Sequence, residues 1–200
     1  PVQRRNYPYG TMAAHVMGFI GEVNDKDLEK RKDLKQGDLI GKRGVELMYD
    51  SITLNNQMYG LRGKDGAEYW EYDADGRRLS EYVPARKQPV PGDNIYLTID
   101  FELQRRAEQY FAENEMVGAA VVLDPRNGEV LAMVSSPTYN PNIYSKRFTP
   151  DTWKEITSNP FKIELNRAIQ GLYSPGSVFK IVMAMAGLSE GAVDPHTSFG

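Results

Sequence analysis

The chain has 200 residues, of which 40% are hydrophobic and 26% are charged, and its formal net charge is −3. This composition is typical of a globular protein of one or two domains, and the small negative charge gives no electrostatic basis for binding nucleic acid or an anionic membrane surface. Because there is no cysteine, a disulfide framework and a thiolate metal site are excluded.

The first 94 residues are rich in turns and predict short elements. Asn24 is a good N-cap for the charged run 25–31, so we expect a capped surface helix there, and the charges that continue to residue 35 indicate a solvated face. A second short helix is predicted over residues 45–54, opened by Gly44. A loop at residues 36–38 separates the two helices.

A β-hairpin is predicted where residues 67–72 and 78–83 flank a five-residue turn. We interpret its tyrosines and tryptophan as cross-strand packing partners, and the alternative is a platform for sugars or bases. Asp73, Asp75 and Gly76 faintly match a calcium loop but lack the closing Glu of that motif, so we expect an ordinary turn.

The three prolines of residues 84–92 interrupt any apolar period, and we place a hinge between two domains there. Asp100 then caps a predicted helix with apolar residues at helical spacing. Those residues are Leu103, Ala107, Tyr110 and Phe111. A second hairpin follows, with apolar strands at 118–123 and 129–135 around the turn dipeptide Asn127-Gly128, and we expect both strands to be buried on both faces.

Ser177 and Lys180 form a Ser-x-x-Lys pair at the start of the apolar run 181–188. Ser174 is a good N-cap and Pro175 suits the first helical position. Ser177 would then lie in the first turn, where free N–H groups and the helix dipole favour negative charge. Side chains three residues apart share one helix face, at about 5–6 Å between Cβ atoms, which suits proton transfer.

Lys180 can act as a base only while it is neutral. Apolar neighbours and the positive end of the helix both favour the neutral amine, desolvation more strongly. The alternative is an exposed pair on an ordinary amphipathic helix, since about one Ser-x-x-Lys is expected by chance in a chain of this length. Because residues 181–188 are apolar nearly all round, we expect a buried core helix, which favours Ser177 as an acylatable nucleophile.

His15 is one of only two histidines, and it lies among apolar residues. It has no second ligand at metal spacing, so we interpret it as a packed histidine rather than a metal ligand. No metal site and no cofactor are predicted. The run 181–188 is also far shorter than the roughly 20 apolar residues that span a bilayer.

Residues 173–180, Tyr-Ser-Pro-Gly-Ser-Val-Phe-Lys, resemble the active-site segment of class B penicillin-binding proteins. Other motifs that resemble this family follow its order along the whole chain, at residues 5–10 with 14–21, 41–49, 97–104, 120–135 and 166–168. Arg-x-Tyr-Pro-Tyr-Gly at the start and Ser-Ser-Pro-Thr-Tyr-Asn-Pro-Asn at residues 135–142 are similar to the elongation-specific branch of the family.

The resemblance implies an α+β fold in two domains. Residues 1–94 would form a non-catalytic pedestal, or dimerisation-type, domain of short helices and a β-hairpin. Residues 95–200 would form the N-terminal part of a penicillin-binding/serine β-lactamase-like transpeptidase domain. The implied activity is a serine D,D-transpeptidase that cross-links peptidoglycan: Ser177 forms the acyl ester, Lys180 is the general base, and the Ser177 N–H supplies half of an oxyanion hole.

The resemblance also implies partners and a location. The partners are peptidoglycan stem peptides ending in D-Ala-D-Ala, β-lactams, a membrane glycan polymerase of the shape/elongation/division family, and a scaffold protein of the elongation complex. The family is held in the cell inner membrane by an N-terminal anchor, with residues like these on the periplasmic side.

Penicillin-binding proteins need a Ser-x-Asn-type and a Lys-Thr-Gly-type motif, and neither occurs in the chain. We therefore expect an internal fragment that would not turn over substrate by itself. Two alternatives stay open: a β-lactam-sensing or class D β-lactamase-like acyl-serine protein, and a purely structural pedestal module. The first lacks segments such as Arg-x-Tyr-Pro and Gly-x-x-Gly-x-Glu, which distinguishes it from this chain.

Overall fold

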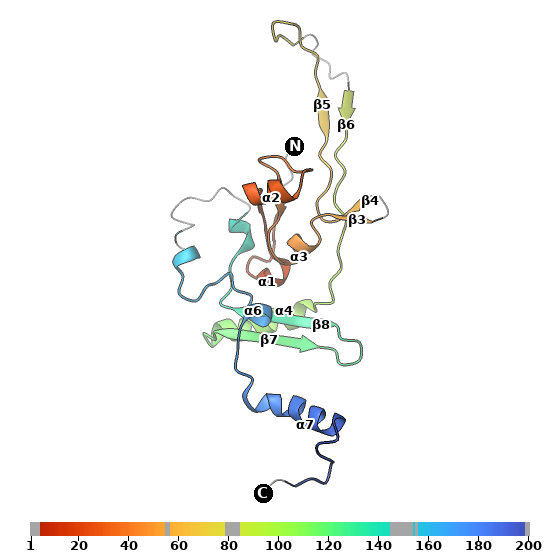
Figure 1. Ribbon diagram of the computed structural model, residues 1–200. Coiled ribbons are helices and arrows are strands. Elements are labelled where there is room, and N and C mark those ends of the chain that lie inside the picture. Colours follow the sequence, from red (N-terminus) through yellow and green to blue (C-terminus); the bar gives the residue numbers. More distant parts are fainter. Residues whose placement is uncertain (1–4, 55–56, 79–84, 145–153, 155, 199–200) are drawn as a thin grey trace. The chain divides into compact units, whose positions relative to one another are not determined.

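The computed structural model describes residues 5–54, 57–78, 85–144, 154 and 156–198 (Figure 1). The side chains of residues 52–54, 57, 58 and 85 are not described. The chain divides into two compact units, Pro1–Ile169 and Gln170–Gly200, and each is treated by itself.

The first unit mixes short helices and two-stranded antiparallel ribbons, as the α+β expectation requires. Its elements are α1 (Ala14–Met17), β1 (Ile20–Glu22), α2 (Asp25–Lys30), β2 (Leu39–Gly41), α3 (Gly44–Met48), β3 (Ile52–Leu54), β4 (Gln57–Tyr59), β5 (Ala67–Tyr69), β6 (Ala85–Lys87), α4 (Phe101–Glu113), β7 (Gly118–Leu123), β8 (Val130–Ser136) and η1 (Pro141–Ile143). Helix α6 (Arg167–Gln170) ends at the boundary, and η2 (Gly176–Val178) and α7 (Phe179–Ser189) form the second unit.

Helix α2 confirms the first predicted helix, because Asn24 and Asp27 form a reciprocal capping box. The Asn24 carboxamide accepts from the Asp27 N–H at 3.1 Å, and the Asp27 carboxylate accepts from the Asn24 N–H at 3.0 Å. Leu28 on the inner face of this helix packs against a small core of Val23, Leu34 and Ile40.

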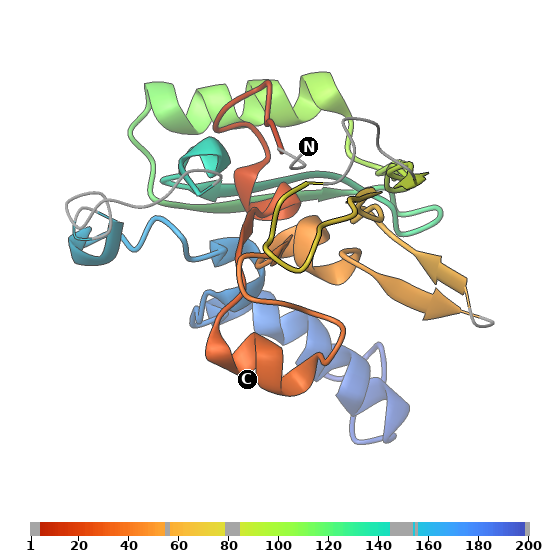
Figure 2. The same ribbon diagram turned by 90° about the horizontal axis from the view of Figure 1, so that it is seen from above.

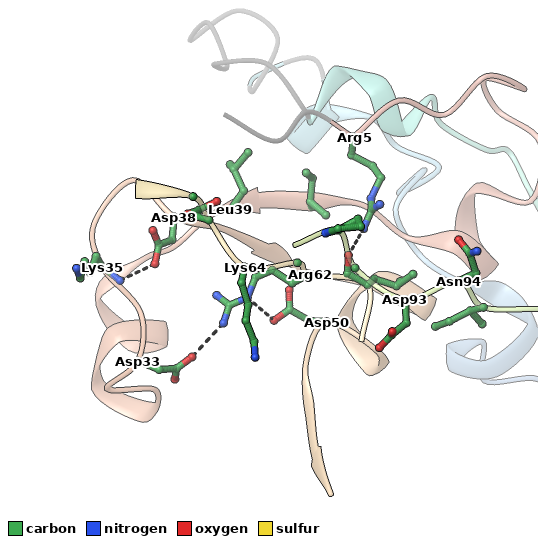
Figure 3. Close-up of a pocket in the computed structure, with 18 of the residues that line it drawn as sticks. Arg5, Asp33, Lys35, Asp38, Leu39, Asp50, Arg62, Lys64, Asp93 and Asn94 are labelled. Atoms are coloured by element: carbon green, nitrogen blue, oxygen red, sulfur yellow. Dashed lines mark hydrogen bonds and ion pairs between the residues drawn. The ribbon is translucent and has the colours of Figure 1, made fainter. Parts of the chain in front are cut away.

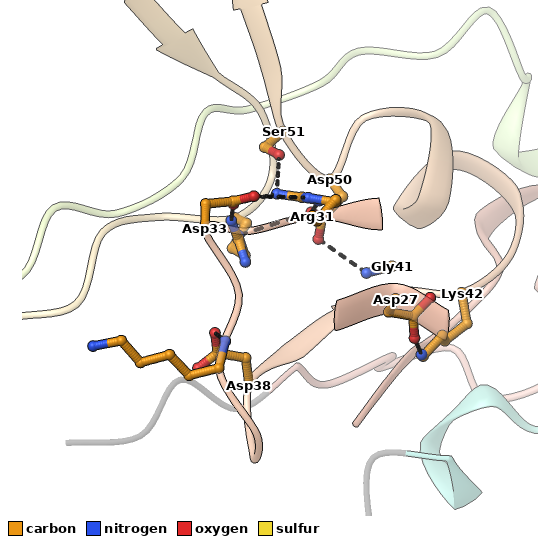
Figure 4. Close-up of polar contacts among 10 residues, drawn as sticks. Asp27, Arg31, Asp33, Asp38, Gly41, Lys42, Asp50 and Ser51 are labelled. Atoms are coloured by element: carbon orange, nitrogen blue, oxygen red, sulfur yellow. Dashed lines mark hydrogen bonds and ion pairs between the residues drawn. The ribbon is translucent and has the colours of Figure 1, made fainter. Parts of the chain in front are cut away.

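Just after α2, Arg31 and Asp33 join an ionic cluster (Figure 4). Asp33 is exposed, as the expected solvated face requires, whereas Arg31 is only partly exposed. The buried Asp50 carboxylate accepts from Arg31 at 2.7 Å and from the Gly41 N–H at 2.9 Å. Asp33 accepts from Arg31 at 2.8 Å and from Arg62 at 3.0 Å. The hydrogen bond from Arg31 lowers the pKa of Asp33 to about 2.

Helix α3 is shorter than the predicted helix 45–54, because the chain leaves the helix after Met48. Residues 52–54 instead form β3, which pairs with β4 through Ile52↔Tyr59 and Leu54↔Gln57. A β-branched pair, Ile52 and Thr53, favours this extended backbone. The pairing of this local hairpin therefore overrides the helical pattern.

The predicted hairpin exists but is longer than the sequence indicated. Strand β5 pairs with β6, with Glu68 opposite Arg86, and the bridge Lys64↔Val90 extends the same ribbon. The segment 84–92, where we placed the hinge, instead carries the returning strand β6 at Ala85–Lys87 and the bridged Val90. Prolines are tolerated here since the ribbon has only two strands, and each has a free edge that needs no N–H donor. Residues 79–84, which include most of the strand predicted at 78–83, lie outside the described residues.

The turn of this hairpin is confirmed, since the Asp73 carboxylate accepts from the N–H groups of Asp75 at 3.0 Å and Arg77 at 2.7 Å. The Arg78 guanidinium lies over the Trp70 ring. Tyr69 and Tyr72 are exposed, so the predicted packing is wrong for both tyrosines.

Helix α4 begins as predicted, because the Asp100 carboxylate accepts from the Leu103 N–H at 2.8 Å. Figure 2 shows the helix lying along the ribbon of β7 and β8. The turn of that ribbon has Gly128 at φ 80°, as the Asn-Gly signal predicts. Strand β8 is largely buried, but the expected burial of β7 on both faces is wrong, because among the described residues it has no strand beyond β8.

A buried amide joins α4 to β8. Gln104 is 0% exposed, and its Oε1 accepts from the Met133 N–H at 2.8 Å. Its Nε2 donates to the Met133 carbonyl at 2.9 Å and to Glu108 at 2.6 Å. Burial raises the pKa of Glu108, which also accepts from the Ala13 N–H at 2.8 Å.

Residues 7–19, here called the N-terminal strap, contact both the other pedestal elements and the later part of the unit. Tyr7 exchanges two hydrogen bonds with the Asn142 side chain, N–H to Oδ1 at 2.9 Å and Nδ2–H to the Tyr7 carbonyl at 2.8 Å. At the other end, Phe19 stacks on Tyr144 with ring centroids 3.7 Å apart. The main core of the unit combines the strap with the later segment, as Ala14, Phe19, Tyr139, Tyr144 and Ile156.

The Tyr7 hydroxyl reaches back into the pedestal. It donates to Glu46 at 3.2 Å and accepts from the Ile20 N–H at 3.2 Å. Glu46 is 3% exposed and pairs with Arg5 at 2.8 Å. Burial raises the pKa of Glu46, and the Arg5 charge opposes that shift. Glu46 is therefore a structural carboxylate within the pedestal.

Replacing Gln104 by Leu tests the buried amide. The substitution introduces an apolar side chain of similar size and leaves the Met133 peptide groups without these partners, so we expect a loss of about 1–3 kcal/mol for each buried group left unpaired. Urea unfolding of the protein measures this. The exposed Gln109→Leu on the same helix should change stability by less than about 0.5 kcal/mol. Equal losses for both variants would contradict the role of Gln104.

Replacing Glu46 by Ala tests the pedestal carboxylate. The change leaves Arg5 without its buried counter-ion and the Tyr7 hydroxyl without an acceptor, so we expect a loss of about 3 kcal/mol. Thermal and urea unfolding measure it, with the exposed Glu29→Ala on α2 as the matched control. Wild-type stability in Glu46→Ala would show that this carboxylate does not hold the pedestal together.

Candidate active site

Ser177 lies in η2, the single 3-10 turn that leads directly into α7, and Lys180 lies in the first turn of α7. The two residues are therefore one turn apart at the start of a helix, as the spacing predicts. The Val178 N–H donates to the Pro175 carbonyl at 3.3 Å and closes the turn around Ser177. Helix starts of this kind present N–H groups that have no intrahelical acceptor.

The predicted cap of this helix is wrong in detail. The N-cap position of η2 is Pro175, and no side chain caps the turn. The reason is Gly176, which has φ 55°, in the left-handed region. Because this residue breaks the right-handed path, Ser174 and Pro175 cannot form the first regular turn of α7.

The expectation of a buried core helix is also not met within the second unit. The apolar side chains of α7 are exposed, and so are Ser177 and Lys180. Among the described residues of this unit there are only η2, α7 and turns, so none of them provides a further element that could bury an all-apolar helix. A contiguous apolar surface of this kind marks a surface that packs against something else.

Within the described residues, no hydrogen bond engages the hydroxyl of Ser177 or the ammonium of Lys180. Catalytic hydrogen bonds often tighten only when substrate binds, so this does not remove either residue as a candidate. What the arrangement offers is a nucleophile at a helix start and an amine one turn later on the same helix. This is the layout of acyl transfer with a lysine base.

The packing interpretation of His15 is confirmed. Its ring nitrogen Nε2 lies 2.8 Å from the Ile163 carbonyl, and its ring meets Tyr139 edge-on at 5.0 Å. Burial lowers the pKa of His15, which favours the neutral ring. In the part of the chain that the structure describes, no group of three or more His, Asp or Glu side chains could hold a metal ion. No helix there is long and apolar enough to cross a bilayer.

A cavity of about 1470 Å³ in the first unit, which no pattern in the sequence indicates, is assembled from segments far apart in the chain (Figure 3). Its charged lining residues are Arg5, Asp33, Lys35, Asp38, Asp50, Arg62, Lys64, Asp65, Lys87 and Asp93. Cations and carboxylates are mixed, and Arg62 lies between Asp33 and Asp50. Among the described residues, no serine, threonine or histidine lines this cavity.

Comparison with known protein families assigns both parts of the chain. Residues 1–97 match the penicillin-binding protein dimerisation domain, and residues 118–200 match the penicillin-binding protein transpeptidase domain. Ser177 and Lys180 lie within the second match. The Arg5, Tyr7 and Glu46 cluster lies within the first.

Several curated relatives are named peptidoglycan D,D-transpeptidase MrdA. The peptidoglycan D,D-transpeptidase MrdA of Acinetobacter baumannii is 42% identical over 97% of this chain and 27% of the relative. The protein of the same name from Escherichia coli K12 is 36% identical over 98% of this chain and 30% of the relative. The chain thus spans less than a third of the length of these relatives.

Solved structures agree with the sequence matches. The penicillin-binding protein PBP2 of Helicobacter pylori, in complex with MreC, is similar with a TM-score of 0.76 and 28% identity, over 98% of this chain and 35% of that one. Pseudomonas aeruginosa PBP2, in complex with WCK 5153, is similar with a TM-score of 0.72 and 31% identity, over 97% of this chain and 37% of that one. The chain therefore belongs to the penicillin-binding proteins, and it carries their dimerisation domain followed by the start of their transpeptidase domain.

Proposed function

We propose that the whole protein is a serine D,D-transpeptidase that cross-links peptidoglycan stem peptides during cell elongation and is acylated by β-lactams at Ser177. The observation that carries the proposal is the position of Ser177 at the start of the η2–α7 helix, one turn before Lys180. The match of the first 97 residues to the dimerisation domain favours this function over a β-lactam sensor or a class D β-lactamase.

The chemistry follows from these two side chains. The Ser177 hydroxyl attacks the carbonyl of a D-alanyl-D-alanine peptide while the neutral amine of Lys180 takes its proton. The Ser177 N–H, at the positive end of the helix, donates to the oxyanion that forms. Expulsion of D-alanine returns the proton to the leaving amine. An amine of a neighbouring stem peptide then attacks the acyl ester. Lys180 takes the proton that this amine loses and returns it to the Ser177 oxygen as the ester bond breaks.

The proposal also assigns different roles to the two parts of the chain. We assign residues 1–94 to a pedestal and residues 95–200 to the catalytic domain, which the family match ending at residue 97 supports. The relative from H. pylori binds MreC, and another relative belongs to a peptidoglycan synthase complex. By analogy the pedestal would bind a scaffold protein and a membrane glycan polymerase, with the protein anchored in the inner membrane and these residues on its periplasmic side.

Replacing Ser177 by Ala should abolish covalent labelling by a fluorescent penicillin in the full-length protein, because no other acylatable hydroxyl begins this helix. The melting temperature should stay within about 2 °C, since the exposed hydroxyl contributes little to stability. Ser174→Ala, three residues earlier, is the control and should label normally. Persistent labelling of Ser177→Ala, found by gel fluorescence and peptide mass, would refute the assignment.

Replacing Lys180 by Arg separates a base from a mere positive charge. A guanidinium keeps the charge but cannot deprotonate in the working range, so acylation should slow by about 100-fold to 10,000-fold. Stopped-flow acylation by a chromogenic β-lactam measures the rate. The control variant Lys87→Arg, in the pedestal, should leave the acylation rate unchanged. A near-wild-type rate for Lys180→Arg would mean that charge alone suffices.

A further inference from the structure

His15 is a buried titratable side chain that the acylation chemistry does not use, and it lies where the two family domains meet within the first unit. The residue is 8% exposed and belongs to α1, in the N-terminal strap. Its Nε2 lies 2.8 Å from the Ile163 carbonyl, so Nε2 carries a proton and donates it to that oxygen. His15 lies within the match to the dimerisation domain, and Ile163 lies within the match to the transpeptidase domain. The hydrogen bond therefore joins one domain to the other.

The 161–168 segment meets the strap through further contacts around this ring. The Asn166 side chain donates to the His15 carbonyl at 3.3 Å. Tyr139, just after β8, meets the imidazole edge-on at 5.0 Å and donates through its hydroxyl to the Ala14 carbonyl at 3.1 Å. Burial among these groups keeps from the imidazole most of the water that would solvate a positive charge.

The charged groups near the imidazole also oppose its protonation. Arg167, in α6, and Arg43, just before α3, both act on it as positive charges. Glu164 lies 3.7 Å from Arg43 and accepts from the Tyr144 hydroxyl. The buried Nη1 of Arg167 has no hydrogen-bond partner among the described residues. No carboxylate in the described part of the chain pairs with the imidazole, so a protonated His15 would add a third positive charge beside two arginines.

We propose that His15 makes the contact between the two domains pH-sensitive: when its ring takes up a proton, the 161–168 segment separates from the strap and the ring becomes solvated. The opening is local, because the hydrogen bonds between the Tyr7 main chain and the Asn142 side chain hold the domains together elsewhere and involve no group that titrates. His15 would act in this way whether or not Ser177 is the nucleophile.

The direction of the pH effect follows from the surroundings of the ring. Burial, together with the charges of Arg167 and Arg43, lowers the pKa of His15 below its ordinary value of 6.5, although the hydrogen bond to Ile163 opposes this shift. In the open form the solvated ring keeps the ordinary value. Above pH 6.5 the ring is neutral in both forms, so the closed form is fully favoured. As the pH falls below 6.5, the open form binds a proton before the closed form does, and the ratio of closed to open falls by up to about 10-fold per pH unit.

Amide hydrogen exchange of the full-length protein measures this opening, with single-residue resolution and correction for the intrinsic exchange rate at each pH. The reporter is the Leu165 amide, which donates to the Lys162 carbonyl at 2.9 Å. Lys162 has φ 46°, in the left-handed region, which a residue other than glycine keeps only while the surrounding structure holds it. The Met133 amide, bonded to the buried Gln104 side chain, reports opening of the core.

At about pH 7.5 the Leu165 amide should be at least about 10-fold less protected than the Met133 amide, because the 161–168 segment opens without unfolding the core. Below pH 6.5 its protection in the wild type should fall by up to about 10-fold per pH unit. His15→Gln keeps an N–H donor for the Ile163 carbonyl and does not titrate, so its Leu165 protection should stay within about 2-fold down to about pH 5.5. His196→Gln replaces the other histidine, which is exposed, and should follow the wild type.

Equal protection of the Leu165 and Met133 amides at every pH would mean that the domains open only as a whole, and it would overturn the proposal. The same pH dependence in His15→Gln as in the wild type would assign the effect to another group and overturn it as well. If His15→Gln does not fold, the wild-type ring decides: its NMR titration should have a midpoint below 6.5, and a midpoint at or above 6.5 would refute the pH-sensitive contact. None of these results bears on Ser177, so the proposed function stands or falls separately.

Discussion

The structure of the first unit depends on how Tyr7 is held. Its main chain is bound by the Asn142 carboxamide, and its hydroxyl lies between Glu46 and the Ile20 N–H. Burial raises the pKa of this hydroxyl, so it stays a donor to the buried carboxylate. One residue thereby joins the sheet and helices of the pedestal to a segment 135 residues later in the chain.

Polar groups as well as apolar contacts define the joint between the two family domains. The strap is bound through its main chain by Glu108, Thr138, Tyr139 and Asn142. Such contacts specify a geometry, because each buried group that loses its partner costs free energy. The pedestal start and the first catalytic elements therefore share one core, in place of the hinge that the prolines indicated.

Features that depend on neighbouring residues could be predicted from the sequence, whereas pairings between residues far apart in the chain could not. Asn24 and Asp100 cap the predicted helices, and Gly128 makes the predicted turn, because each acts on neighbours within a few residues. No pattern in the neighbouring residues predicts strand β6 or the hydrogen bonds between Tyr7 and Asn142. Ser177 and Lys180 were proposed from their spacing, whereas the burial expected for their helix depends on elements that no pattern in the chain reveals.

Native-state hydrogen exchange of the folded protein tests the central claim that the strap and the catalytic elements form one cooperative unit. The Tyr7 and Ala13 amides, which are bonded to Asn142 and Glu108, should open with the same free energy as the Met133 amide of β8. Exchange of the Tyr7 and Ala13 amides that is orders of magnitude faster, while the Met133 amide stays protected, would contradict it. The strap would then open independently of the core.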